Sequence, residues 1–171
     1  MNTLICARLK VNLGGIMRKF EKISKDEFQK YFKIEEYEGF NLPRRATKSS
    51  AGYDFFAISD YVFHPGEKFL VPTGYKVKME SDEMLMIVIR SSMAIKRSIR
   101  VVNQVGIIES DYYNNESNEG HIFVSLENFG DEDFVLEKGV AYAQGIFTKF
   151  LVTDDDVALN KRTGGIGSTT K

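Results

Sequence analysis

The sequence predicts an all-β fold, a jelly-roll-like β-barrel preceded by a short N-terminal helix. Many short apolar segments either alternate with a period of two or run continuously, as strands do. Turn signals separate these segments at close spacing, which is typical of barrels and jelly rolls. The chain has 171 residues, of which 43% are hydrophobic, so it is long enough for one domain with a substantial core.

Charge and cysteine content exclude several classes of protein. The net charge of −1 provides no basic field for nucleic acid, so any anionic ligand must be held by a few local cations. The single cysteine, Cys6, excludes an intrachain disulfide and argues against a cysteine-rich zinc site. No apolar run is long enough to span a membrane, and residues 4–7 are too few for a signal-peptide core. We therefore expect a cytoplasmic protein with neither a nucleic-acid nor a membrane partner.

Three segments differ in composition and divide the chain. Residues 1–40 are expected to form an N-terminal extension with a short helix, and residues 41–159 the β-barrel. Residues 160–171 are expected to form a flexible, glycine-rich C-terminal arm. Residues 1–16 show no hydrophobic period, and two glycines lie just before Met17. We therefore expect Met17, rather than Met1, to be the natural start.

The helix is predicted from a capping box at residues 24–27, in which the Ser24 side chain caps the helix and Glu27 reaches back to Ser24. Phe28, Tyr31 and Phe32 continue it as an apolar stripe. The helix is expected to end near Gly39 and to pack onto the domain.

Strands are predicted from residue 41 onward. Residues 51–57 (AGYDFFA) follow a small-residue turn, and residues 68–79 alternate around a Pro-Thr-Gly turn. Residues 84–89 form a continuous apolar run, which predicts a buried strand that ends abruptly at Arg90. Residues 122–126 alternate again, and residues 141–150 form the last strand.

Candidate catalytic carboxylates follow a β-branched segment at residues 101–113, VVNQVGIIESDYY. Residues two apart share a face of a strand, so Glu109 and Asp111 point the same way if the strand continues that far. A carboxylate at the mouth of a hairpin can activate water, and an aromatic ring beside it can form one wall of a pocket. The residues alone leave open which carboxylate does so, and they also suit a solvated acidic turn.

The C-terminal segment NKRTGGIGSTTK is rich in glycine and hydroxyl groups and has no apolar stripe. It is not a Walker P-loop, because no lysine stands between its last glycine and Ser168. It could still wrap a phosphate chain, because glycines let backbone N–H groups approach closely.

In order along the chain, the segments AGYDFFA, IRSSMA, NQVGIIESDY, GVAYAQ and RTGGIGST resemble the five motifs of trimeric deoxyuridine triphosphatases (dUTPases). The resemblance spans residues 42–169. It implies a homotrimer with three active sites at subunit interfaces, which cleaves dUTP to dUMP and pyrophosphate. Such an enzyme limits uracil incorporation into DNA and supplies dUMP for thymidylate synthesis.

The resemblance also implies roles for individual residues. By position, Glu109 stands for the aspartate that activates water, and Asp54 is the acid of the first motif. Mg²⁺ is implied as cofactor, held by the triphosphate and waters near Asp54 and by no direct protein ligand. The C-terminal arm, residues 160–171, is expected to close the active site over the substrate. The residues expected to bind phosphate are Arg90, Ser91, Ser92, Gln144, Arg162, Gly165, Gly167 and Ser168. The residues expected to bind uracil and deoxyribose are Asn103, Gly106, Ile108, Tyr112 and Ile166.

This sequence departs from the family pattern at several positions. Glu109 replaces an aspartate, Ile166 replaces the aromatic residue that covers uracil, and Val140 and Ala141 replace an acid and an arginine. A longer polar loop follows Tyr112. The extra methylene of Glu109 moves the base by about 1 Å, a misplacement that can cost ~100-fold in rate.

Three alternatives remain from the sequence. dCTP deaminases have a glutamate three residues before an asparagine, where this chain has Ser125 before Asn128, and Glu127 is expected to face the other side. A nucleotide-binding regulator of the same fold, with weak or no turnover, would fit the changed base and ring. A purely structural β-barrel would not explain the glycine-rich C-terminal segment.

Overall fold

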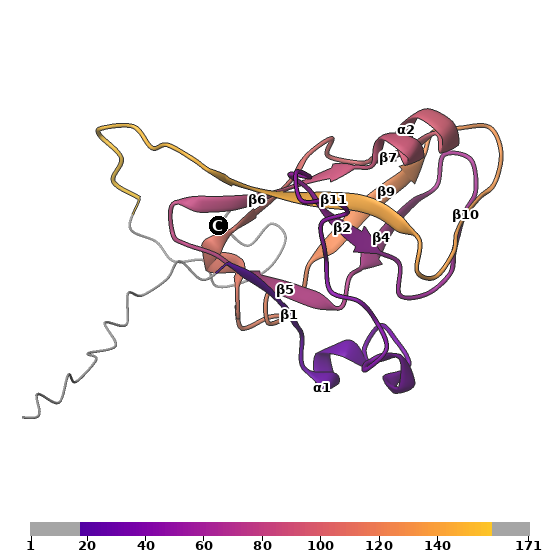
Figure 1. The fold of residues 1–171 in the computed structure, drawn as a ribbon, viewed down its shortest axis with the longest axis horizontal. Helices are drawn as coiled ribbons and strands as arrows, with labels where there is room; N and C mark the ends of the chain where they lie inside the picture. Colours follow the sequence, from indigo (N-terminus) through magenta and orange to yellow (C-terminus); the bar gives the residue numbers. More distant parts are fainter. Residues whose placement is uncertain (1–17, 159–171) are drawn as a thin grey trace, which may run out of the picture.

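The computed structural model describes residues 18–158 and confirms an all-β architecture (Figure 1). The strands are β1 (Lys19–Lys22), β2 (Tyr53–Phe56), β3 (Tyr61–Phe63), β4 (Lys68–Pro72), β5 (Tyr75–Lys78), β6 (Glu83–Ile89), β7 (Ile99–Val101), β8 (Gly106–Glu109), β9 (Phe123–Asn128), β10 (Phe134–Leu136) and β11 (Ala141–Lys149). The helical elements are short: α1 (Lys25–Phe28), α2 (Ser91–Arg97) and two 3-10 turns, η1 (Ile34–Glu36) and η2 (Ser110–Tyr112).

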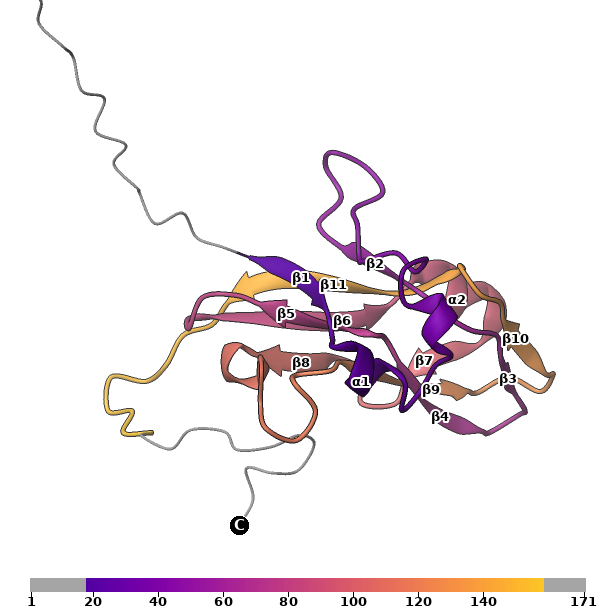
Figure 2. The same cartoon turned by 90° about the horizontal axis from the view of Figure 1, so that it is seen from below.

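The described strands form four antiparallel sheets. The largest has the order β2-β11-β6-β8 and the next β4-β9-β7, and β1-β5 and β10-β3 form pairs. Strands β6 and β11 lie in one layer and β4 and β9 in the other (Figure 2). Within residues 18–158 no sheet closes on itself, so the architecture is a jelly-roll-like arrangement of facing sheets.

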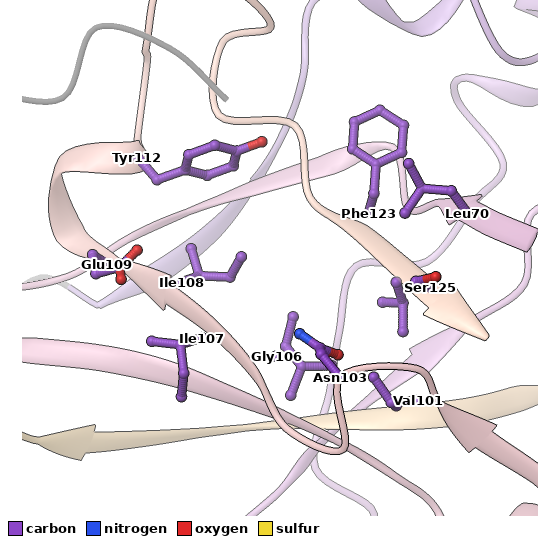
Figure 3. Close-up of a pocket in the computed structure, with 12 residues that line it drawn as sticks. Leu70, Val101, Asn103, Gly106, Ile107, Ile108, Glu109, Tyr112, Phe123 and Ser125 are labelled. Atoms are coloured by element: carbon purple, nitrogen blue, oxygen red, sulfur yellow. The ribbon is translucent and has the colours of Figure 1, made fainter. Parts of the chain in front are cut away.

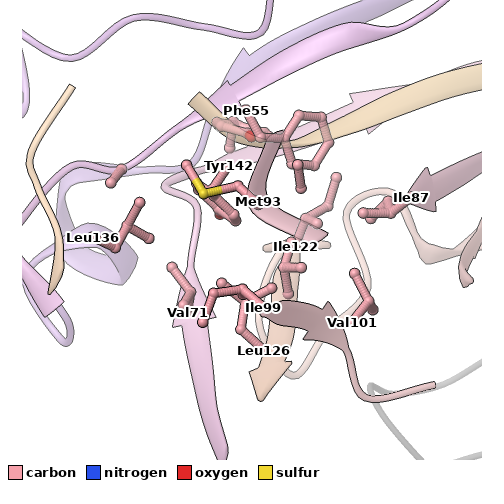
Figure 4. Packing of buried hydrophobic residues seen from close by; sticks show 14 of the residues in the cluster. Phe55, Val71, Ile87, Met93, Ile99, Val101, Ile122, Leu126, Leu136 and Tyr142 are labelled. Atoms are coloured by element: carbon pink, nitrogen blue, oxygen red, sulfur yellow. The ribbon is translucent and has the colours of Figure 1, made fainter. Parts of the chain in front are cut away.

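The core lies between the layers and follows the predicted alternation (Figure 4). Tyr75 and Val77 are buried in β5, and Val124 and Leu126 in β9. The apolar run of β6 divides between two faces. Leu85 and Ile87 are buried on the face toward the core, whereas Met84, Met86 and Val88 are half-buried. Each fully buried Leu or Ile contributes about 1.5–3 kcal/mol to the free energy of folding.

The predicted N-terminal helix is shorter than expected. It ends at Phe28 and is followed by a turn and η1, so the expectation of a helix to Gly39 is wrong. The ring centroids of Phe28 lie 4.7 Å from Phe32 and 5.3 Å from Phe40. These rings form a second apolar cluster with Ile23 and Ile58, and this packing outweighs the weak tendency of a short segment to remain helical.

Half of the predicted capping box is present. The Ser24 hydroxyl accepts a hydrogen bond from the Glu27 backbone N–H at 3.1 Å, as predicted. The reciprocal bond is wrong, because the Ser24 N–H donates to Glu119 Oε2 at 3.0 Å. Glu27 is instead buried and pairs with Lys30. A distant loop therefore supplies the second cap.

Strand β1 and helix α2 are among the elements that were not predicted. Strand β1 pairs with β5, and Phe20 packs with its ring centroid 5.5 Å from Tyr53 and 5.6 Å from Phe147. Helix α2 follows β6 where only the abrupt end of a strand was expected, and Met93 is its one buried residue. A four-residue strand and a helix with one buried side chain leave almost no periodic signal. None of the helices in residues 18–158 has the length and apolarity to cross a membrane.

Candidate active site

A cavity of about 280 Å³ lies between β8 and β9 (Figure 3). Of the residues predicted to bind the nucleoside or activate water, Asn103, Gly106, Ile108, Glu109 and Tyr112 all line it. The remaining lining residues are Leu70, Ile87, Val101, Ile107, Phe123, Val124 and Ser125. The structure thus brings together one group of the sequence-predicted site residues.

The turn between β7 and β8 forms one side of this cavity. It connects two different sheets, with Gln104 in a left-handed conformation (φ 64°) and the Val105 N–H donating to Asn103 O at 2.7 Å. Gly106 lies against β6, where a Cβ atom would be 3.2 Å from the Cβ of Ile87. In the described sheet β8 is an edge strand, so the backbone groups of its outer edge are not used by a strand ladder.

The structure separates the two candidate carboxylates. Strand β8 ends at Glu109, opposite Met84 of β6, and the chain then turns into η2. The strand does not continue to Asp111, so the two carboxylates do not share a strand face. Glu109 is half-buried and lines the cavity, whereas Asp111 is exposed and is not among the lining residues.

Tyr112 forms a wall of the cavity, as its position beside the carboxylates indicated. Its side chain is only 7% exposed. Its hydroxyl donates to His121 O at 3.0 Å and accepts from Asn118 Nδ2 at 2.8 Å. These bonds fix the far end of the ring.

Those predicted phosphate-binding residues that the structure describes, Arg90, Ser91, Ser92 and Gln144, gather in a second hollow of about 320 Å³. It is lined by Ala46, Ser50, Gly52, Asp54, Arg90, Ser91, Ser92 and Gln144. Asp54 of β2 lies opposite Gln144 of β11 in the strand register. Arg90 Nε is 3.3 Å from Asp54 Oδ1, and its Nη1 donates to Ala141 O at 3.1 Å. A cation and its paired carboxylate, three serine hydroxyls and an amide therefore surround one opening.

The linings of the cavity and of the second hollow share no residue. The remaining predicted site residues, Arg162, Gly165, Ile166, Gly167 and Ser168, lie outside the described residues.

Several residues that line the cavity or the second hollow were not predicted from the sequence. Phe123 and Ser125 could have been found, because they alternate with the buried residues of β9 and therefore face the other side. Leu70 and Gly52 carried no comparable signal.

The arrangement disfavours the deaminase alternative. Ser125, in the place of that family's glutamate, lines the cavity. Glu127 shares the strand face of Ser125, because the two residues are two apart in β9, so the expectation that it faces the other side is wrong. Its carboxylate nevertheless accepts a hydrogen bond from Arg100 Nε at 2.9 Å and is not among the cavity-lining residues. Arg100 lowers the pKa of Glu127, which keeps it charged.

Comparison with known proteins decides the family. A sequence model of the dUTPase family matches residues 38–170. The chain belongs to the dUTPase family. A deoxyuridine 5'-triphosphate nucleotidohydrolase of Lactococcus lactis subsp. lactis (strain IL1403) is 49% identical over 133 residues, which cover 77% of this chain and 89% of the relative. One from Rickettsia canadensis (strain McKiel) is 37% identical over 147 residues, 81% of this chain and 95% of that relative.

Solved structures give the same result for the fold of this dUTPase. The crystal structure of dUTPase from Streptococcus mutans superposes with a TM-score of 0.67 at 40% identity, covering 79% of this chain and 98% of the other. A dUTPase of Staphylococcus bacteriophage 80alpha is similar in fold, with a TM-score of 0.62 at 17% identity. The predicted resemblance and the dUTPase fold are confirmed, and the roles of individual residues remain predictions.

Proposed function

We propose that this dUTPase is a cytoplasmic enzyme that hydrolyses dUTP to dUMP and pyrophosphate. The observation that carries the proposal is the composition of the cavity beside β8. An edge-strand backbone, an aromatic wall at Tyr112 and a carboxylate at Glu109 all border one space of about 280 Å³. That size approaches the lower end of the range for small-molecule sites.

Base selection would come from the backbone of β8. Uracil presents an N–H between two carbonyl oxygens, whereas cytosine presents an acceptor and an amino group at the corresponding positions. An edge strand offers N–H and C=O groups in fixed alternation, which can pair with one pattern and leave the other unsatisfied. A site built to satisfy hydrogen bonds rejects a mismatched analogue far more strongly than an apolar pocket does.

Glu109 would act as general base. It takes a proton from water, the water oxygen bonds to the α-phosphorus, and the bond from that phosphorus to the α,β-bridging oxygen breaks to release pyrophosphate. Phosphoryl transfer needs positioning and charge stabilisation rather than a protein nucleophile. Arg90 suits this second task, because its planar guanidinium donates paired hydrogen bonds to phosphate oxygens.

Mg²⁺ fits this site as an ion held mainly by the triphosphate. No group of three or more His, Cys, Asp or Glu side chains that could hold a metal occurs between residues 18 and 158. Asp54 is the acid in the phosphate hollow, where it could accept a hydrogen bond from a metal-bound water. Bound to the triphosphate, the ion would neutralise its negative charge.

The active site would be completed between copies of the chain in a homotrimer. The nucleoside cavity and the phosphate hollow share no residue, although a single bound nucleotide must contact residues of both. Pairing the cavity of one copy with the phosphate hollow of another would resolve this, and three copies in a ring would give three equivalent sites.

Pyrophosphate release from dUTP, dTTP, dCTP and UTP with Mg²⁺ tests the proposal. We expect release from dUTP and little from the other three nucleotides. Binding of dUTP without release of pyrophosphate would favour the regulator alternative, and ammonia release from dCTP would favour the deaminase.

A further inference from the structure

The loop of residues 113–120, which follows Tyr112, has no role in the function proposed above. Its side chains form a hydrogen-bond network on the outer side of the Tyr112 ring. The Tyr112 hydroxyl accepts from Asn118 Nδ2 at 2.8 Å and donates to His121 O at 3.0 Å. These bonds hold the hydroxyl against the protein, while the ring lines the cavity (Figure 3).

The Asn118 side chain uses its whole amide in this network. Its nitrogen donates to the Tyr112 hydroxyl and, at 3.2 Å, to His121 O. Its oxygen accepts from Asn115 Nδ2 at 2.8 Å and from the Gly120 N–H at 3.1 Å. An amide has two N–H donors and one oxygen acceptor, so these four bonds determine its orientation.

The loop that carries Asn118 is itself held in place. Asn115 is buried, and its oxygen accepts from the backbone N–H and the hydroxyl of Ser117 at 3.0 and 2.7 Å. Gly120 has a φ of 81°, and a Cβ there would be 2.6 Å from Tyr112 O, so the loop closes directly on the tyrosine backbone. Asn118 therefore cannot follow a displaced ring.

The end of the loop is also anchored to the body of the protein. Glu119 accepts from the Ser24 backbone N–H at 3.0 Å and from the Ser24 hydroxyl. Its carboxylate lies 3.5 Å from Lys76 Nζ. The support for Tyr112 thus runs through Asn118 to the N-terminal segment, which precedes the range matched by the family model.

We propose that Asn118 is a positioning residue that fixes the Tyr112 ring and thereby sets the selectivity for deoxyribose over ribose. The inference rests on the proposed function and extends it. Tyr112 is expected to bind the deoxyribose, and in this proposal its ring packs against C2′ of the sugar. It then excludes a 2′-hydroxyl only while the ring cannot retreat, and Asn118 opposes that retreat by donating a hydrogen bond to the Tyr112 hydroxyl. Loss of the Asn118 side chain would let the ring move away and admit UTP.

The test compares kcat/KM for dUTP and UTP in the full-length protein. Asn118→Ala is expected to lower the dUTP:UTP ratio by roughly fivefold or more, the equivalent of one lost hydrogen bond. Ser117→Ala is the matched control, since it removes one hydrogen bond of the same loop without contacting Tyr112, and it should leave the ratio unchanged. Should Asn118→Ala fail to fold, Asn118→Leu, which is of similar size but can neither donate to nor accept from the Tyr112 hydroxyl, takes its place and is expected to lower the ratio too.

A double-mutant cycle separates positioning from general loosening of the loop. In a Tyr112→Phe background the hydroxyl is gone, so Asn118→Ala should change the ratio by less than it does in the parent. Equal changes in both backgrounds would overturn the inference, as would an unchanged ratio in Asn118→Ala. If the parent hydrolyses dUTP but the Asn118 variants keep the parent's dUTP:UTP ratio, only the role of Asn118 is refuted. If the parent itself has no turnover, the proposed function is refuted and the inference with it.

Discussion

Replacing Glu109 with glutamine should abolish turnover and leave nucleotide binding intact. The substitution keeps the length and shape of the side chain and removes its negative charge, and with it the capacity to accept a proton from water. Glu109 is half-buried at the end of β8, where its backbone stays paired opposite Met84, so the fold should not change. Loss of a general base typically lowers kcat by about 10²- to 10⁴-fold, which corresponds to roughly 3–5 kcal/mol of transition-state stabilisation.

The structure also supplies the matched control. Asp111 carries the same functional group two residues away, but it is exposed and is not among the cavity-lining residues. Asp111→Asn should therefore behave like the parent. Glu109→Asp should raise kcat, because it shortens the arm by about 1 Å towards the length found in the family.

Pyrophosphate release gives kcat, and calorimetric titration with a non-hydrolysable dUTP analogue gives Kd for each variant. Near-parental turnover in Glu109→Gln together with an inactive Asp111→Asn would show that Asp111, and not Glu109, is the base. Parental turnover in both variants would show that neither carboxylate is the base.

Three further outcomes follow from individual residues. Gly52→Ala should raise KM for dUTP by about 10- to 100-fold with little loss of stability, because its Cβ would lie 2.2 Å from Gln144 Oε1 and displace that flexible side chain. Gly39→Ala is the control, since the nearest atom to a Cβ there is at 4.0 Å. An unchanged KM in Gly52→Ala would show that Gln144 is not part of the site. Burial lowers the pKa of His121 to about 3, so the folded state binds fewer protons than the unfolded state below pH 6.5. Urea unfolding should show stability that is complete above pH 6.5 and falls by about 1.4 kcal/mol per pH unit below it towards pH 3, and a flat profile would contradict this. Truncation before Arg162 should abolish turnover and leave the unfolding transition unchanged, and full activity would show that residues 162–171 have no part in catalysis.

The sequence predicted those elements whose side chains alternate against the core. Strand β9 is an example, since Val124 and Leu126 within it, and Ile122 directly before it, are all buried as their period indicated. It could not predict α2 or the early end of α1. Those elements depend on tertiary contacts, such as the packing of Phe28 on Phe40, which outweigh local preference in short segments.

The sequence predicted which residues form the two groups of the candidate site, but it did not predict that the two groups line separate hollows. Motif order assigned Asn103 and Tyr112 to the nucleoside, Glu109 to the activation of water, and Arg90 and Gln144 to phosphate. The two hollows appear only after β8 and β11 take their positions in the sheet. The support of Tyr112 by the following loop was also hidden, because hydrogen bonds among polar loop side chains have no sequence period.

The most direct test of the account is to mix two inactive variants. Glu109→Gln removes the base that borders the nucleoside cavity, and Arg90→Ala removes the cation of the phosphate hollow, while each variant leaves the other half of the site intact. The two variants are unfolded and refolded together, and co-purification of differently tagged copies verifies that chains have exchanged. Activity should then return to about a quarter of the parent's, because in random assembly one shared site in four receives both an intact cavity and an intact phosphate hollow. Mixed oligomers that stay as inactive as the separate variants would show that both halves belong to one chain, and the account of a site completed between copies would be wrong.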